Sequence, residues 1–444
     1  MIAALIAAAT IGGQVTGSPI AHVVVVIQEN RTFDNLFASS VLANGAPFPG
    51  ADAVQTATID GKRIALRVTP FEDPHDPDHT HPSLLAEWNG GKLDGWGKDK
   101  IFNYTSLPAP SAPPNFPIAH VPDYETTVYH MLAHAYALAD ENFSPRLAPT
   151  FPGHLFLIAA QSTAADDPTD PVNWGCDSVP GTTVPLFGSG ENEVFPGIFP
   201  CFDYPTIGDL LDRAHVSWKY YTGALGTALD ANINVYDAIE HIRNGAAWAN
   251  VSTPMSNVLG DIASCKLPQV AYVTPTWMNS DHAAELTNGG PGWVGSLYMA
   301  LAQTLKNPDP ACRYYSNTAM IITWDDSGGW YDHVAPPAGP DGTHWGFRVP
   351  IIVVSPWAKN GFISHTQRET TSIVRYIEKN WALGDLGARD ASGDDLSDMF
   401  DYARAKPIAP FPDVVMERSI RASSPGWSLA ASLRDAHSVD NDDR

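Results

Sequence analysis

Four short apolar runs, rich in β-branched residues, constrain the fold of this chain more than any other feature. They cover residues 22–28, 269–274, 319–324 and 349–354. A continuous apolar run of this length is typical of a strand that is buried on both faces of a parallel sheet. Helical patterns lie between the runs and after the last of them, at residues 124–138, 206–215, 293–306 and 370–381. This alternation predicts an α/β sandwich with helices on both faces of a mostly parallel sheet.

Proline and glycine, 38 and 35 of 444 residues, predict many ordered loops over this core, and residues 179–200 form one such segment. No internal repeat or domain boundary is visible, so we expect one domain over residues 20–411. Residues 412–444 are polar and predict a peripheral tail. Residues 1–19 are an apolar terminus or the remnant of a secretory signal, and no Lys or Arg occurs before Arg31.

The cysteines and the apolar runs bear on the compartment. Two disulfides between sequence neighbours, Cys176–Cys201 and Cys265–Cys312, would fit a secreted or periplasmic protein. The other two pairings and four free thiols remain open at this stage. No apolar run is long enough to cross a bilayer, so integral membrane association is not expected.

The charge excludes one class of partner. With 26 Lys and Arg against 49 Asp and Glu, the formal charge is 26 − 49 = −23. Binding to polyphosphate depends on clustered cations that release counterions. We therefore expect neither nucleic acid nor an anionic lipid surface as a general partner.

Acidic residues follow two of the predicted strands. Glu29 and Asn30 come directly after residues 22–28, and Asp325-Asp326 follows residues 319–324. Ligands of open α/β sheets bind beyond the carboxyl ends of the strands. Carboxylates gathered there repel one another unless a cation neutralises them, which favours a hard divalent ion. The alternative is that these groups cap helices or pair with arginine.

A hydroxyl and several histidines complete the candidate chemistry. Thr150 stands at the predicted start of a helix, where backbone N–H groups and the helix dipole favour a phosphate, although plain N-capping is the simpler interpretation. His79, His282 and His333 lie in loops near predicted strand ends, where acid/base chemistry or phosphate contacts are credible. No role is assigned to His120, His130, His134, His215, His241 and His437. Four aromatic residues near these positions could line a pocket, although packing is the better interpretation for each: Trp324, Trp330, Tyr331 and Trp345.

Several ordered motifs resemble one family between about residues 20 and 400. They include Glu29-Asn-Arg-Thr-Phe-Asp34, Asp76-Pro-Asp-His79, Ala148-Pro-Thr-Phe-Pro-Gly153, Ser280-Asp-His282 and Thr323-Trp-Asp-Asp-Ser-Gly-Gly-Trp-Tyr-Asp-His333. The chain is similar to the bacterial phosphoesterases that comprise secreted phosphatidylcholine-type phospholipases C and respiratory-burst-inhibiting acid phosphatases. The resemblance implies an alkaline-phosphatase-like three-layer sandwich and a metal-assisted hydrolysis of phosphate esters.

The resemblance also implies roles for single residues. The implied metal ligands are Glu29, Asn30, Thr150, Asp325 and Asp326. Thr150 is the implied nucleophile, through a phosphothreonine intermediate, and the histidines around the phosphate are His79, His282 and His333. An oxygen-rich site favours one Ca²⁺, Mg²⁺ or Mn²⁺ ion, with zinc or iron possible. Departures from the family pattern at Ala148, Gly153-His154 and Asp326 bear mainly on substrate preference.

The expected substrate is a small phosphate ester or a phospholipid headgroup, and the choice between diester and monoester stays open. The alternative is a secreted metal-binding or adhesion protein that keeps the fold without catalysis. The hydroxyl of Thr150 and the full acidic set favour the enzyme, since a binding protein has no need of an activated hydroxyl.

Overall fold

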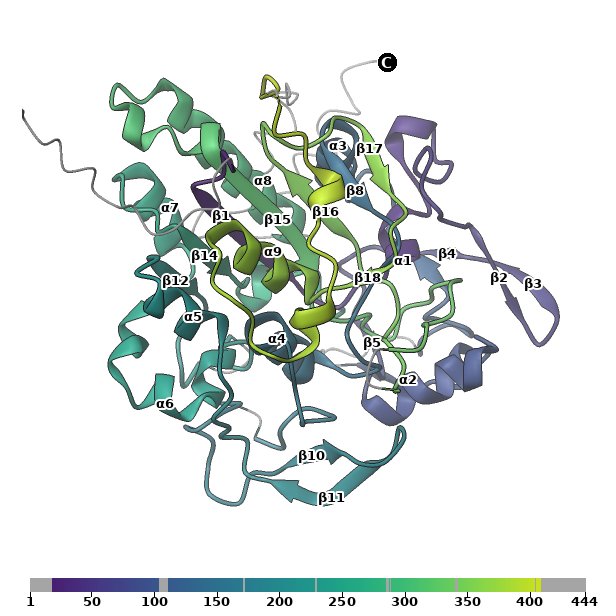
Figure 1. The fold of residues 1–444 in the computed structure, drawn as a ribbon. Helices are drawn as coiled ribbons and strands as arrows, with labels where there is room; N and C mark the ends of the chain where they lie inside the picture. The colour runs from purple at the N-terminus through teal and green to yellow at the C-terminus, as the bar shows by residue number, and fades with distance from the viewer. Residues whose placement is uncertain are drawn as a thin grey trace, which may run out of the picture.

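An eight-stranded sheet lies at the centre of the molecule (Figure 1), in the order β13-β12-β14-β1-β15-β16-β8-β17. The strands are β1 His22–Gln28, β8 Ala137–Ala139, β12 Trp218–Tyr221, β13 Val251–Ser252, β14 Val270–Val273, β15 Thr318–Trp324, β16 Ile351–Val354 and β17 Phe362–Ser364. This computed structural model describes residues 18–408 apart from 104–110, 171, 228–229, 285–286, 288, 340–341 and 404. The proposed tail lies outside the described residues, and so does the apolar terminus except for residues 18 and 19.

The sheet is mixed but mostly parallel, which confirms the predicted fold class. β1 is parallel to β14 and to β15, and Val23 to Gln28 are all buried, as expected for a strand covered on both faces. Only β16 runs antiparallel to its neighbours in the sheet, β15 and β8. Its carboxyl end therefore lies at the opposite edge from the ends of β1 and β15.

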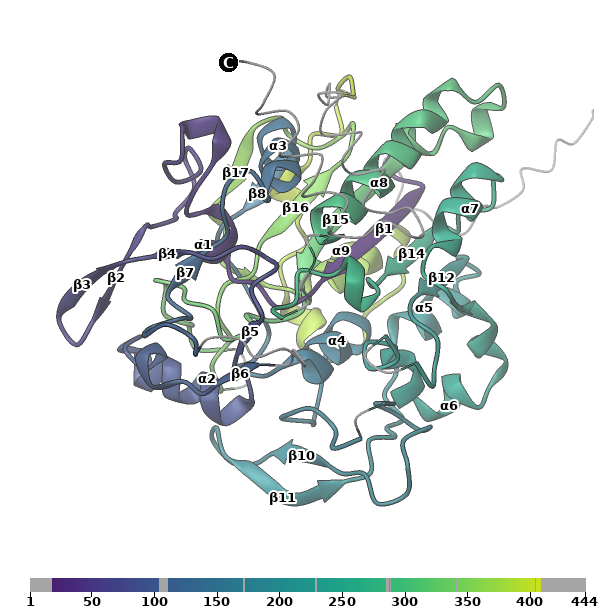
Figure 2. The same cartoon turned by 180° about the vertical axis from the view of Figure 1, so that it is seen from behind.

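Helices cover both faces of the sheet, as Figures 1 and 2 show from opposite sides. On one face α4 (Thr150–Ala159), α5 (Ile207–Arg213) and α9 (Ser372–Trp381) pack together. On the other face α8 (Gly289–Gln303) packs between α3 (Thr127–Ala135) and α7 (Asn257–Ala263). These helices and the sheet form the predicted three-layer sandwich.

Smaller elements surround the sandwich. Further helices among the described residues are α1 Phe33–Phe37, α2 His81–Trp88 and α6 Glu240–Arg243. Two-stranded ladders join β2 Thr56–Ile59 to β3 Lys62–Ala65, β4 Arg67–Val68 to β7 Ala119–His120, β5 His75–Pro77 to β6 Ile101–Asn103, and β18 Arg368–Glu369 to β9 Asn142–Phe143.

Two local predictions were wrong. The helix expected over residues 124–138 ends at Ala135, because Ala137–Ala139 pairs as β8 with β16 and β17. The loop expected over residues 179–200 contains an antiparallel hairpin of β10 (Val184–Phe187) and β11 (Glu193–Ile198). Both of its strands contain proline, which a two-stranded hairpin tolerates because each strand has an unpaired edge.

The cysteine pairing by proximity is confirmed, since Cys176 bonds to Cys201 and Cys265 to Cys312. Within the described residues, no helix combines the length and the apolar character that crossing a bilayer would need. The oxidised cysteines are consistent with an extracellular location.

Candidate active site

The carboxyl ends of β1 and β15 bring the two acidic pairs together. The strands are parallel neighbours, and Gln28 pairs in register with Trp324, so the residues that follow emerge side by side. Asn30 adopts a left-handed backbone conformation, with φ of 58°, which asparagine tolerates better than most residues. Its backbone N–H donates to Asp325 Oδ1 at 3.1 Å, which fixes the two strand ends to each other.

Thr150 lies against these strand ends. It is the first residue of α4, one position later than a capping residue, and it makes no cap to its own helix. Its Oγ1 lies 3.3 Å from the side-chain amide of Asn30 and 3.4 Å from Asp326 Oδ2. A backbone donor in the same turn, Phe151 N–H, is bound at 2.9 Å by Asp167 Oδ1, a neighbour that the sequence did not indicate.

The acidic residues are buried without enough positive charge to balance them. Glu29 and Asp325 are fully buried, and burial together with the neighbouring Asp326 carboxylate raises the pKa of both groups well above the ordinary values. Asp325 Oδ2 makes no hydrogen bond to any described residue. A buried carboxylate oxygen without a partner is costly, and a bound cation would satisfy it. The donor set therefore fits a metal ion.

His154 is a further member of this donor set, although the sequence did not indicate it as a candidate ligand. Its Nε2 lies 2.9 Å from Glu29 Oε1 and 3.7 Å from Asp325 Oδ2. One ligand atom from each of these three residues lies within 4.8 Å of the others, as a metal site requires. Burial lowers the pKa of His154, which favours the neutral imidazole that metals bind. The available signal was its spacing, four residues after Thr150 and so on the same face of the helix.

Two imidazoles face the other end of the Asn30 amide. With the amide nitrogen directed to the carboxylates, its oxygen lies 3.0 Å from His79 Nε2 and 3.1 Å from His282 Nε2. The Nδ1 atoms are held by backbone carbonyls, that of Pro77 at 2.8 Å and that of Ala283 at 2.7 Å. Both rings are thus oriented with Nε2 toward the centre of the site.

The surroundings separate the charge states of these two imidazoles. Burial acts to lower the pKa of His79, but the carboxylates of Asp76 and Asp326 outweigh it and raise that pKa to about 10. Burial, with the charge of His79 beside it, lowers the pKa of His282 to about 3. Trp277, which the sequence did not single out, lies over His282 with ring centroids 4.1 Å apart.

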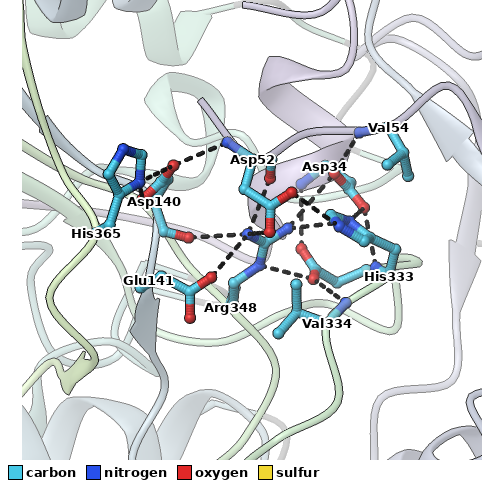
Figure 3. Close-up of polar contacts among 10 residues, drawn as sticks. Asp34, Asp52, Val54, Asp140, Glu141, His333, Val334, Arg348 and His365 are labelled. Carbon is cyan, nitrogen blue, oxygen red and sulfur yellow. Dashed lines mark hydrogen bonds and ion pairs between the residues drawn. The ribbon is translucent and has the colours of Figure 1, made fainter. Parts of the chain in front are cut away.

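His333 belongs to a neighbouring network of charges rather than to the contacts of Thr150 (Figure 3). Its Nδ1 lies 2.7 Å from Asp34 Oδ2, and its Nε2 lies 3.3 Å from Asp52 Oδ1. Burial acts to lower the pKa of His333, yet its hydrogen bond to Asp34 and the nearby carboxylates raise it to about 9.

Arg348 is the centre of this network. The buried guanidinium donates from Nε to Asp332 Oδ1 at 2.8 Å and from Nη1 to the carbonyl oxygens of Asp52 and Asp140 at 2.9 Å each. The network thereby connects the start of β16 to the loop after β15 and to the Asp34 motif. Both motif aspartates, Asp34 and Asp332, thus have structural partners here.

The aromatic residues expected near the site have mostly packing roles. Trp324 is buried and donates from Nε1 to Asp281 Oδ2 at 2.9 Å. Trp330 and Tyr331 are also buried, and the half-buried Trp345 packs on Phe143. The interpretation as packing residues is confirmed for Trp324, Trp330 and Tyr331.

Comparisons with known proteins indicate the family of the chain. The model of the phosphoesterase family matches residues 20–384. Phospholipase C A of Mycobacterium tuberculosis is 26% identical over 86% of this chain and 78% of its own length. The non-hemolytic phospholipase C of Pseudomonas aeruginosa is 24% identical over 90% of this chain and 60% of its own length. A solved structure of a protein in the alkaline phosphatase superfamily from Vibrio parahaemolyticus covers 90% of this chain and 72% of that chain, with 9% identity and a TM-score of 0.37.

The chain belongs to the phosphoesterase family. It is therefore a phosphoric ester hydrolase, with relatives among the phospholipases C. The alternative of a binding protein without catalysis is not supported.

Proposed function

We propose that this protein is a metal-dependent phospholipase C-type phosphodiesterase with Thr150 as its nucleophile. The observation that carries the proposal is the position of Thr150 Oγ1, 3.4 Å from Asp326 Oδ2 and 3.3 Å from the Asn30 amide, at the ends of two parallel strands. The phospholipases C among its relatives favour a phospholipid headgroup diester over a phosphate monoester.

One divalent ion would be held by the buried residues around Thr150, namely Glu29, Asn30, Thr150, His154, Asp325 and Asp326. When bound, such an ion supplies Lewis-acid stabilisation of the charge that develops on the nucleophile and on the phosphoryl oxygens. The oxygen-rich set favours Ca²⁺, Mg²⁺ or Mn²⁺, while the nitrogen of His154 would also suit a zinc or iron ion.

The proposed reaction assigns a step to each residue around the position where the phosphate ester would bind. Thr150 Oγ attacks in line, the bond from phosphorus to the leaving alcohol breaks, and Asp326 takes the hydroxyl proton. His79, the protonated imidazole of the pair, gives a proton to the leaving oxygen. The resulting phosphothreonine still carries the headgroup when the substrate is a diester. Water then attacks phosphorus, returns its proton to the imidazole and releases the headgroup phosphate, while Thr150 regains its proton from Asp326.

His333 has a positioning role in this scheme. Its contacts with Asp34 and Asp52 hold the loop that begins with Asp325-Asp326, and so they hold the acidic pair in place. The two disulfides support a secreted or periplasmic location for the enzyme.

Replacement of the nucleophile tests the proposal. We expect Thr150→Ala to lower turnover of the p-nitrophenyl ester of phosphorylcholine by about 10³-fold or more, and Thr150→Ser to retain part of it. Chelation should abolish turnover by the parent enzyme, and the metal should restore it. Full turnover by metal-loaded Thr150→Ala would refute the covalent route. Preference for p-nitrophenyl phosphate would identify an acid phosphatase instead.

A further inference from the structure

The hairpin of β10 and β11 exposes a row of large apolar side chains. Phe195 has 67% of its surface exposed, and four further apolar residues of the same segment are exposed, namely Val179, Val194, Ile198 and Phe199. Val194, Phe195 and Pro196 are consecutive and all exposed, so both faces of this strand stand clear of the core. A concentration of apolar surface on one projecting element marks an interaction site, whereas scattered apolar residues need no such explanation.

The rest of the hairpin is held firmly, so the exposed row is not a loose segment. The disulfide between Cys176 and Cys201 closes the loop that contains both strands. At its turn, Glu191 accepts from Arg146 Nη2 at 3.0 Å, and the guanidinium of Arg146 lies 3.7 Å from the ring centre of Phe187. A backbone that is already fixed loses little conformational entropy when the element binds.

The hairpin is attached next to the active site. His81 Nε2 lies 2.8 Å from the carbonyl oxygen of Glu191, and His81 follows His79 by two residues. Arg146, which binds the same turn, precedes Thr150 by four residues. Figures 1 and 2 both place the hairpin at the same end of the molecule as α4. A surface bound by the hairpin would therefore lie close to the site.

The charge of the segment selects the partner. Between residues 179 and 199 the charged side chains are Glu191 and Glu193, with no Lys or Arg, and the chain as a whole carries −23. Such a surface is repelled by anionic lipid, because juxtamembrane binding to anionic lipid relies on basic residues. A zwitterionic phospholipid layer has an apolar interior that these side chains can enter, and it carries no net negative charge that would repel the acidic segment.

We infer that the β10–β11 hairpin is an interfacial docking element, which inserts Val194, Phe195, Ile198 and Phe199 into the surface of a zwitterionic phospholipid layer. The inference rests on the proposed phospholipase function and extends it, since it specifies aggregated rather than dispersed lipid as the substrate. A shallow insertion of this kind anchors a protein reversibly at the interface.

Vesicle binding by full-length variants tests the inference. We expect Phe195→Ser and Phe199→Ser each to weaken binding to phosphatidylcholine vesicles by about tenfold, because moving an exposed aromatic side chain out of water contributes about that factor. Tyr124→Ser is the matched control, since Tyr124 is 64% exposed on a different element. Binding is measured by flotation in the presence of chelator, so that lipid is not consumed. Turnover of the soluble phosphorylcholine ester should be unchanged in all three variants.

The outcomes separate this inference from the proposed activity. Equal vesicle binding by Phe195→Ser, Phe199→Ser and the parent protein would overturn the inference. So would a parent protein that does not bind phosphatidylcholine vesicles, or that binds vesicles containing phosphatidylserine more tightly. None of these results would affect hydrolysis of the soluble ester. Conversely, a parent enzyme that does not hydrolyse the soluble ester would refute the proposed activity. Vesicle binding by the parent and the two variants would still support or overturn the docking role of the hairpin.

Discussion

A methyl group added at Gly153 should move the site residues of α4 away from the site residues at the ends of the strands. Gly153 lies in the first turn of α4, between Thr150 and His154, and faces the strand end of β15. A Cβ atom there would lie 2.8 Å from the backbone oxygen of Asp325 and 3.2 Å from its carbonyl carbon. Ordinary van der Waals contact begins at 3.4 Å, so the helix must move away by roughly 0.6 Å (3.4 − 2.8).

This displacement is large for catalysis and modest for folding. Thr150 and His154 would move with the helix, while Glu29 and Asp325 stay on the sheet. Catalytic groups need placement within about 0.5 Å, and a displacement of about 1 Å costs about 10²-fold in rate. We expect Gly153→Ala to lower kcat/KM by about 10- to 100-fold. Overpacking costs about 1–3 kcal/mol, but alanine gains about 1 kcal/mol of helix propensity, which leaves a net loss of about 0–2 kcal/mol.

The chain offers a matched control for this substitution. Gly260 lies inside α7, and a Cβ at Gly260 has nothing within 4 Å among the described residues. Gly260→Ala should therefore raise the free energy of unfolding by about 0.5–1 kcal/mol and leave kcat/KM unchanged. Soluble-ester kinetics and urea unfolding of both variants give the comparison. If Gly153→Ala keeps kcat/KM within about twofold of the parent, the close contact between α4 and β15 does not set the geometry of the site.

Three further substitutions test the pKa of His333, the proposed binding of metal by His154, and the dependence of the buried carboxylates on Arg348. The folded pKa of His333, about 9, lies above its ordinary value of 6.5, so its stabilising effect is fully present below pH 6.5 and disappears as the pH rises through about 9. After allowance for partial exposure, His333→Asn should cost about 2 kcal/mol at pH 6 and little at about pH 9.5 in urea unfolding, and equal losses at both values would contradict the pKa. His154→Gln should weaken metal binding by about 10- to 100-fold in calorimetric titration, and an unchanged affinity would remove His154 from the ligand set. Arg348→Met leaves Asp34 and Asp332 buried without their cation, so thermal unfolding should report a loss of about 3–5 kcal/mol, whereas a loss below about 1 kcal/mol would show that these carboxylates do not depend on the guanidinium.

The sequence supplied the strands and much of the candidate site because those features are local. The apolar run at residues 22–28 coincides with β1, and the acidic pairs directly after β1 and β15 had to meet once the strands were parallel neighbours. Residues whose place in the site depends on a helix face or a loop contact were harder to predict from the sequence. His154 was missed because its position in the site depends on the approach of α4 to Glu29. His333 was grouped with the phosphate histidines, although its neighbours in the structure are Asp34, Asp52 and Arg348.

Residue patterns alone thus indicate an α/β sandwich with hydroxyl, carboxylate and imidazole groups near strand ends, and membership of a phosphoesterase family. The tertiary structure alone decided the antiparallel direction of β16, the split between the Thr150 site and the Arg348 network, and the exposure of Phe195. The physical reason is that an apolar pattern reports how deeply a segment is buried but is the same for either strand direction. Direction, partner and exposure are set by contacts between residues far apart in the chain.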